Sequence, residues 1–101
     1  MDDQKIKVKA MCLFIHNGKV LACKGYDEKK DETFYRIVGG NVDFGEKHGD
    51  AVRREIIEEL GSEIENLSFI KSIENIFTFN GEVGHQIVFI YKGDLSDKAL
   101  Y

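Results

Sequence analysis

The sequence has few of the residues that most often reveal a function directly. Its 101 residues include no proline and only two cysteines. Two cysteines are too few for a disulfide scaffold, and Cys12 and Cys23 lack the spacing of a zinc site. We therefore expect a protein of the reducing cytoplasm. The lack of proline indicates nothing about function.

Other absences limit the partners. No apolar run reaches the roughly 18 residues of a membrane-spanning helix, and the first residues, MDDQKIK, are not typical of a signal peptide. The net charge is −4, which argues against binding to a nucleic-acid backbone or an anionic membrane. The length suffices for one domain and is too short for two. We expect a single domain, residues 1–101, without a nucleic-acid or membrane partner.

Acidic residues are concentrated in one stretch. Seven of the 18 acidic residues lie in residues 46–65. Glu55, Glu58 and Glu59 stand at positions i, i+3 and i+4, so on a helix their carboxylates share about a third of the circumference. Like charges at this spacing repel. The cluster is explained if it binds a divalent cation, and oxygen ligands suit Mg²⁺ or Mn²⁺. An ordinary helix with an acidic outer face is the simpler alternative.

The helix that carries these glutamates is predicted to run from about residue 48 to residue 60, with Gly61 as its C-terminal stop. Its core-facing side is predicted to consist of Val52, Ile56, Ile57 and Leu60. Ala51 falls among the glutamates, where its small side chain leaves room for ions and phosphates. Arg54 lies beside the glutamates. We expect it to form a structural ion pair with Glu46.

Charged residues and glycines around this helix follow a fixed spacing. They are Gly40, Glu46, Arg54, Glu55, Glu58, Glu59 and Gly61. Five residues separate the first two, and seven separate Glu46 from Arg54. The stretch from Gly40 to Ser62 resembles the Nudix box, the signature of the Nudix hydrolases. Ser62, usually apolar, and Val38, often proline, depart from the pattern, but no charged position does.

The resemblance implies an enzyme that hydrolyses a nucleoside diphosphate linked to another moiety, such as a nucleoside triphosphate or a nucleotide sugar. It implies Mg²⁺, or Mn²⁺, held by Glu55, Glu58, Glu59 and the carbonyl oxygen of Gly40. Glu55 would also activate or orient the attacking water, and Arg54 would orient the glutamates. A nucleotide-binding or protein-binding module of the same fold, with little turnover, is the alternative. A calcium-loop protein is excluded, because the acidic loop after residue 26 lacks the alternating ligand spacing.

The remaining chain predicts an α/β fold with a mixed sheet, similar to the Nudix fold. Strands are expected at residues 5–15, 19–24, 34–38, 67–79 and 85–92, with a polar loop at residues 25–33. Asn17-Gly18 predicts a two-residue hairpin. Its register would place Cys12 opposite Cys23, with Cα atoms about 5.5 Å apart or less. The pair is either redox-sensitive or simply two small buried side chains.

The resemblance covers nearly the whole chain, but family members usually continue into a C-terminal helix over the second face of the sheet. We therefore expect that helix to be absent or truncated, and a homodimer to cover the apolar face. A general base on a later loop would then be missing. Glu82 and His85 are candidate substitutes, whereas His48 is expected to be exposed to solvent.

Overall fold

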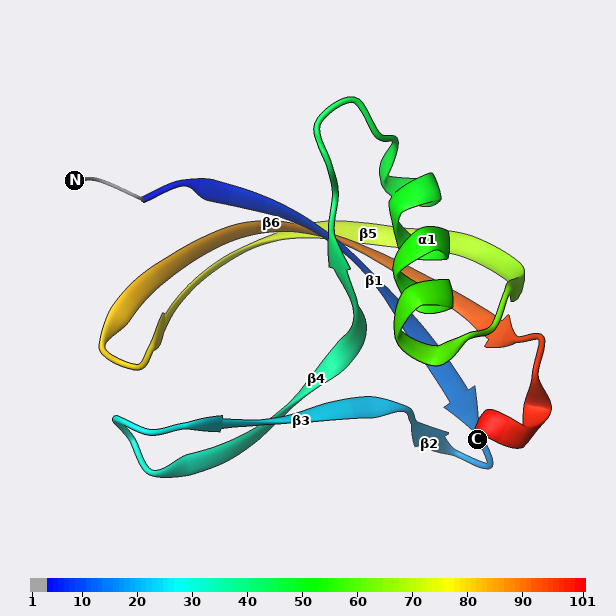
Figure 1. The fold of residues 1–101 in the computed structure, drawn as a ribbon, viewed down its shortest axis with the longest axis horizontal. Coiled ribbons are helices and arrows are strands. Elements are labelled where there is room, and N and C mark those ends of the chain that lie inside the picture. Colours follow the sequence, from blue (N-terminus) through cyan, green and yellow to red (C-terminus); the bar gives the residue numbers. More distant parts are fainter. Residues whose placement is uncertain (1–3) are drawn as a thin grey trace.

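The computed structural model describes residues 4–101, which form a mixed sheet with one α-helix against it (Figure 1). This confirms the predicted fold class. The elements in chain order are β1 (Ile6–His16), β2 (Lys19–Val20), β3 (Ala22–Asp27), β4 (Glu32–Asn41), α1 (His48–Leu60), β5 (Ile64–Phe79), β6 (Glu82–Leu95) and the 3-10 helix η1 (Lys98–Leu100). No helix within residues 4–101 is long and apolar enough to cross a membrane.

The strands β1 and β6 form the centre of the sheet. The order is β3-β4-β1-β6-β5, and β2 pairs with the end of β1. β1 runs parallel to β6, with Ala10 opposite Phe89, and antiparallel to β4, with Ala10 opposite Gly40. The two long strands that flank β1 are therefore remote from it in sequence, and only β2 is a sequence neighbour. The last strand, β6, thus lies inside the sheet, between β1 and β5.

The first hairpin forms as predicted, but its return strand is short. Asn17 and Gly18 form the turn with φ angles of 53° and 75°, the left-handed region that a two-residue turn requires. Only β2 then pairs with β1. After the Leu21 N–H donates to the Phe14 carbonyl, the chain leaves β1, and β3 pairs with β4 instead.

The predicted contact between the two cysteines is therefore wrong. Cys12 lies opposite Val38 on β4 and opposite Tyr91 on β6, so both sides of its strand are occupied. Cys23 lies opposite Arg36. The predicted loop at residues 25–33 is also mostly strand, because β3 continues to residue 27 and β4 begins at residue 32. Its polar composition reflects an exposed hairpin and not a lack of regular structure.

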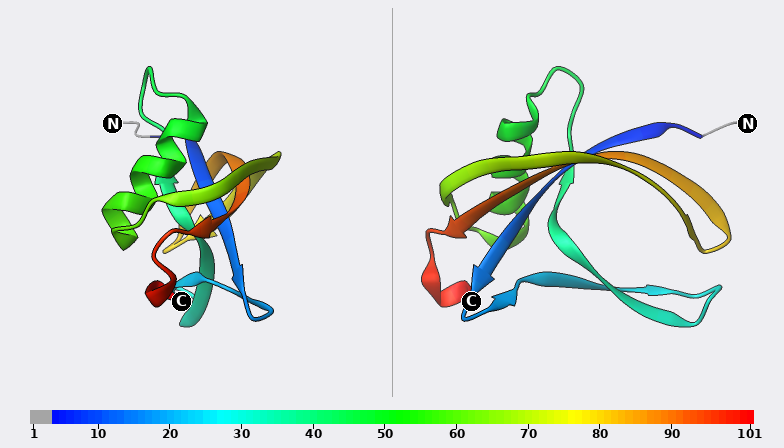
Figure 2. Two further views of the ribbon diagram at one scale, coloured as in Figure 1. Left: turned by 90° about the vertical axis from the view of Figure 1, so that its right-hand side faces the viewer. Right: turned by 180° about the vertical axis from the view of Figure 1, so that it is seen from behind.

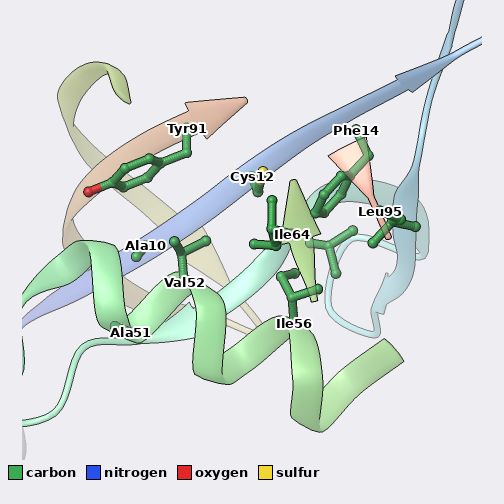
Figure 3. Packing of buried hydrophobic residues seen from close by; sticks show 10 residues of the cluster. Ala10, Cys12, Phe14, Ala51, Val52, Ile56, Ile64, Tyr91 and Leu95 are labelled. Carbon is green, nitrogen blue, oxygen red and sulfur yellow. The ribbon is translucent and has the colours of Figure 1, made fainter. Parts of the chain in front are cut away.

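The core lies between α1 and the face of the sheet that it covers (Figure 3). Ten buried residues form it: Ala10, Cys12, Phe14, Val38, Ala51, Val52, Ile56, Ile64, Tyr91 and Leu95. Alternate residues of β1 point into this layer, as expected for a strand with one face covered. Burying a side chain such as Ile56 contributes about 1.5–3 kcal/mol.

The helix begins and ends where the sequence predicts, but the side of it that packs on the sheet differs in part from the predicted side. Val52 and Ile56 are buried as predicted, whereas Ile57 is half exposed. Ala51 is fully buried in the core, so the prediction that it borders the ion site is wrong. Gly61 ends the helix in the left-handed conformation, and its N–H donates to the Ile57 carbonyl at 2.9 Å.

The other face of the sheet carries no helix within residues 4–101. The β3–β4 and β5–β6 hairpins extend away from α1, and their tips lie side by side at the end of the molecule remote from the helix (Figure 2). The face of the sheet between them is called the inner face below. It is the apolar face that the sequence predicted to be uncovered.

Candidate active site

Arg54 lies at the centre of the candidate site. Its guanidinium donates to both carboxylate oxygens of Glu46 (2.8 and 3.0 Å), to Glu55 (2.9 Å), to Glu58 (3.2 Å) and to the Asn41 carbonyl (2.9 Å). Arginine suits this position because its planar fork of N–H groups reaches several oxygens at once. The contacts confirm the predicted Glu46–Arg54 pair. They also join β4, the following loop and α1.

The loop before α1 is closed by its own hydrogen bonds. The Asp43 N–H donates to the Glu46 carboxylate, and the Glu46 N–H donates to the Asp43 carbonyl, both at 3.0 Å. Gly45 between them adopts a φ of 83°, which glycine accommodates without strain. The hydrogen bond from Arg54, followed by the one from Asp43, lowers the pKa of Glu46 to about 2. Glu46 is therefore an anionic anchor of the loop at neutral pH.

Gly40 and Glu55 lie directly against each other. A Cβ atom placed on Gly40 would be 2.2 Å from Glu55 Oε1, so a larger residue on β4 would displace the carboxylate. Gly39 is equally restricted, since its Cβ would be 2.3 Å from the Ala10 carbonyl oxygen. The two glycines thus let the backbone of β4 approach both β1 and the helix. The role of the Gly40 carbonyl oxygen as a metal ligand beside Glu55 stays a prediction.

A further cation, Lys9, lies opposite Asn41, whose carbonyl oxygen accepts a hydrogen bond from Arg54. Burial lowers its pKa, as do Lys7 and Arg36, whereas Glu55 and Glu59 act in the opposite direction. No motif or spacing in the sequence marks Lys9 as part of the site. Its position follows from the pairing of β1 with β4, which places Lys9 opposite the residue that follows Gly40.

The predicted metal ligands have the oxygen donors that a divalent ion needs, but in this structure their side chains do not converge on one point. Arg54 holds Glu55 and Glu58, and the described residues contain no group of three His, Cys, Asp or Glu side chains close enough to hold a metal ion. Carboxylate and carbonyl oxygens are nevertheless the donors that Mg²⁺ and Mn²⁺ prefer. The Glu58 side chain is 57% exposed and can turn by a rotamer change. Arg54 contacts Oε2 of Glu55, whereas Oε1 is the atom that lies against Gly40, so Glu55 can bind an ion while Arg54 holds it.

The histidines lie elsewhere in the fold. His48 is partly buried, not exposed as predicted: its Nδ1 is hydrogen-bonded to the Tyr91 hydroxyl, and its ring stacks on Phe89 at 3.9 Å. His85 pairs with Glu74 at 2.7 Å. It lies opposite the first residue of β1, about 13 Å along the strand from Ala10, which pairs with Gly40. This position does not favour His85 as a general base.

A family model described as "NUDIX domain" matches residues 5–100. The chain belongs to the NUDIX domain family. The helix α1, the loop before it and the charged residues around Arg54 all lie within the matched range.

Solved structures of similar fold include NUDIX proteins from several bacteria. A NUDIX hydrolase from Nitrosomonas europaea has a TM-score of 0.71 at 18% identity, over 92% of this chain and 61% of its own. A MutT NUDIX hydrolase from Burkholderia pseudomallei has a TM-score of 0.69 at 25% identity, over 90% of this chain and 68% of its own. The E. coli ORF135 protein has a TM-score of 0.57 at 21% identity, over 92% of this chain and 67% of its own. The chain thus spans about three fifths of the Nitrosomonas protein.

Proposed function

We propose that the chain is a pyrophosphohydrolase that depends on Mg²⁺ or Mn²⁺. It would cleave the phosphoanhydride bond of a nucleoside diphosphate linked to another moiety, as in a nucleoside triphosphate or a nucleotide sugar. The contact between Glu55 and the Gly40 backbone supports this most directly. It brings a carboxylate of the helix and a glycine backbone of the sheet to the same point, and both have the oxygen donors that divalent ions prefer.

The proposed role of each residue follows from the oxygen or nitrogen atoms that it presents. Glu55, Glu58 and Glu59, with the carbonyl oxygen of Gly40, would hold the ion. A bound divalent ion neutralises phosphate charge and lowers the pKa of coordinated water. Glu55 would also orient or activate the attacking water. Arg54 would orient the glutamates, and it stays protonated because Glu46 above all raises its pKa.

A substrate screen with matched variants tests the proposal. Nucleoside triphosphates, nucleotide sugars, dinucleoside polyphosphates and ADP-ribose are incubated with the wild-type chain and Mg²⁺, and products are quantified. We expect Glu58→Gln and Glu59→Gln to lower kcat by orders of magnitude. Their melting temperatures should stay close to the wild-type value, since an exposed ion pair stabilises little. The control is Glu63→Gln, because Glu63 lies just beyond the helix. Unchanged kinetics in both helix variants would refute the assignment.

The second candidate is a binding module of the same fold with little turnover. The hold of Arg54 on Glu55 and Glu58 favours it, because the guanidinium already offsets part of their negative charge without a metal ion. Such a module would bind nucleotides with the same affinity with and without Mg²⁺, and Glu59→Gln would leave the affinity unchanged. The pyrophosphohydrolase would instead show affinity or turnover that depends on the ion.

We further propose that the protein acts in the cytoplasm as a homodimer, without a nucleic-acid or membrane partner. The edge strand β5 supports association, because large apolar side chains on it are exposed: Phe69, Ile70, Ile73 and Ile76. An uncovered apolar surface of this kind favours a protein contact. Sedimentation that shows a well-folded monomer at micromolar concentration would contradict the dimer.

A further inference from the structure

The tips of the β3–β4 and β5–β6 hairpins are joined by a reciprocal pair of hydrogen bonds. The Glu28 N–H donates to Asn80 Oδ1 at 2.9 Å, and the Asn80 N–H donates to Asp27 Oδ1 at 3.3 Å. The partners are 52 and 53 residues apart in sequence. Asp27, Glu28 and Asn80 are called the hairpin clasp below. The clasp joins the two edges of the sheet around the inner face (Figure 2).

The two side chains that take part in the clasp, those of Asp27 and Asn80, are fixed in place. Asp27 is only 4% exposed, and its Oδ1 also accepts hydrogen bonds from the N–H groups of Lys29 (3.0 Å) and Lys30 (3.2 Å). A buried carboxylate is tolerated when several N–H groups satisfy it. Asn80 has a φ of 52° and precedes Gly81 with a φ of 81°, so a two-residue turn presents its side chain.

Aromatic rings line the space next to the clasp. Phe34 covers Gly25, its cross-strand partner on β3, and Phe77 covers Gly84 on β6; a Cβ on either glycine would be 2.4 Å from the ring. Rings that cover glycine in this way reinforce strand pairing. Phe34 also meets Phe79 edge to face, with centroids 5.8 Å apart. The two hairpins therefore contact each other through rings as well as through the clasp.

The inner face is hollowed between these hairpins. A cavity of about 420 Å³ is lined by apolar and aromatic side chains, by the amides of Asn75 and Gln86, and by Lys9 and Arg36. A second hollow of about 330 Å³ shares Phe34 with the first and reaches Asp27. The cavity thus extends from Lys9, which lies opposite Asn41, the residue whose carbonyl accepts a hydrogen bond from Arg54, toward the clasp.

We propose that the hairpin clasp fixes the separation of the two hairpins, and so positions in this cavity the organic group of the substrate that lies beyond the diphosphate. The inference rests on the proposed function. Asp27 and Asn80 are then positioning residues and do not touch the reacting atoms. Without the clasp, binding must also order the hairpins, which weakens affinity without altering bond cleavage.

Two matched turns allow a clean test. Asn80→Gly removes the side-chain oxygen that accepts the hydrogen bond from the Glu28 N–H. Glycine adopts the positive φ of this position without strain, so the turn itself is kept. Asn17→Gly makes the same change in the first hairpin, where Asn17 has a φ of 53°. With the substrate that the wild-type chain turns over fastest, we expect Asn80→Gly to raise KM about five- to tenfold, as for one lost hydrogen bond. We expect kcat to change less than twofold in Asn80→Gly, and Asn17→Gly to match the wild type.

Hydrogen exchange supplies a readout that does not depend on activity. The Glu28 amide should exchange about tenfold faster in Asn80→Gly, and at the wild-type rate in Asn17→Gly. Asp27→Asn keeps an Oδ1 acceptor and should retain a KM near the wild-type value, whereas Asp27→Ala should resemble Asn80→Gly. A lower melting temperature with unchanged KM would reduce the clasp to a structural role and overturn the inference.

The result also separates this inference from the proposed function. No turnover by the wild-type chain would refute the proposed function and the positioning role together. Turnover by the wild type, with equal KM in Asn80→Gly and Asn17→Gly, would refute the positioning role alone.

Discussion

The helix and the loop before it (residues 39–61) contrast with the two hairpins that extend from the sheet. In the first region, buried apolar residues and the contacts of Arg54 fix the helix against β4. In the second, Ile64 is the only buried residue of the 16 in β5, and the tips are joined by the hairpin clasp. The proposed ion-binding groups thus lie on the more tightly packed region, and the proposed substrate cavity lies on the more open one.

This division separates two requirements of the proposed reaction. Groups that act on the bond must keep a fixed geometry, which a packed scaffold provides. The region that receives the rest of the substrate can tolerate larger motions, because local stability is lower where few apolar contacts are buried. Four predictions test whether the two regions differ as much as the structure indicates.

The largest contrast is expected between two isoleucines. Ile56→Ala creates a cavity in the core and should lower the free energy of unfolding by about 2–5 kcal/mol. Ile76→Ala on β5, where the side chain is 64% exposed, should cost less than about 1 kcal/mol. Urea denaturation followed by circular dichroism measures both. Equal losses would show that the side chain of Ile76 is packed as tightly as that of Ile56 and would contradict the contrast.

Two glycines give the next contrast. Gly40→Ala would overlap Glu55, which Arg54 holds in place, and should destabilise by about 1–3 kcal/mol. Adding Glu55→Ala relieves the overlap, so the double variant should be more stable than Gly40→Ala alone. Gly84→Ala overlaps the Phe77 ring to a similar degree, but that ring borders an open cavity and can move, so a smaller loss is expected. The same denaturation assay ranks the three variants.

Neighbouring arginines provide a smaller contrast within the helix. Arg54→Ala removes hydrogen bonds to three carboxylates and to the Asn41 carbonyl, and should cost about 1–2 kcal/mol, allowing for its partial exposure. Arg53→Ala removes one hydrogen bond to the Ile64 carbonyl and should cost about 0.5 kcal/mol. Thermal unfolding at low and at high salt measures both. A cost for Arg54→Ala no larger than for Arg53→Ala would exclude Arg54 as the link between loop and helix.

The smallest effect is a pH dependence of the loop. The pKa of Glu46 falls from 4.5 to about 2 in the folded chain, so its contribution to stability is present above pH 4.5 and is lost as the pH falls toward 2. Glu46→Gln should therefore be less stable than the wild type at neutral pH, and the two should converge near pH 2. Thermal unfolding across this range measures the difference. A constant difference down to pH 2 would contradict the cause assigned to Glu46.

The sequence predicted the first region well because its signals are local. The helix ends depend on Gly61 and on a periodic run of apolar residues, and the Glu46–Arg54 pair joins residues only eight positions apart. Two local predictions are wrong. Four candidate core positions do not determine which of them the sheet covers, so the pattern misplaces Ile57 and Ala51. Nothing near His48 in the sequence indicates its contacts with Phe89 and Tyr91.

The second region could not be predicted to the same extent, because pairing between remote segments decides it. Nothing near Leu21 indicates that β3 leaves β1 for β4, and this exchange separates Cys12 from Cys23. The clasp joins residues more than 50 positions apart, with no periodic pattern to reveal it. Lys9 could not be identified for the same reason, since only strand register brings it opposite Asn41, next to the loop of the site.

The turn at Asn80 and Gly81 also has a chemical consequence. An asparagine that precedes glycine is the most readily deamidated, because the following backbone nitrogen can attack its side-chain amide. The products are aspartate and isoaspartate, and either would place a new negative charge beside the carboxylate of Asp27. As a sample ages, this repulsion would open the hairpin tips while the helix and its core remain intact.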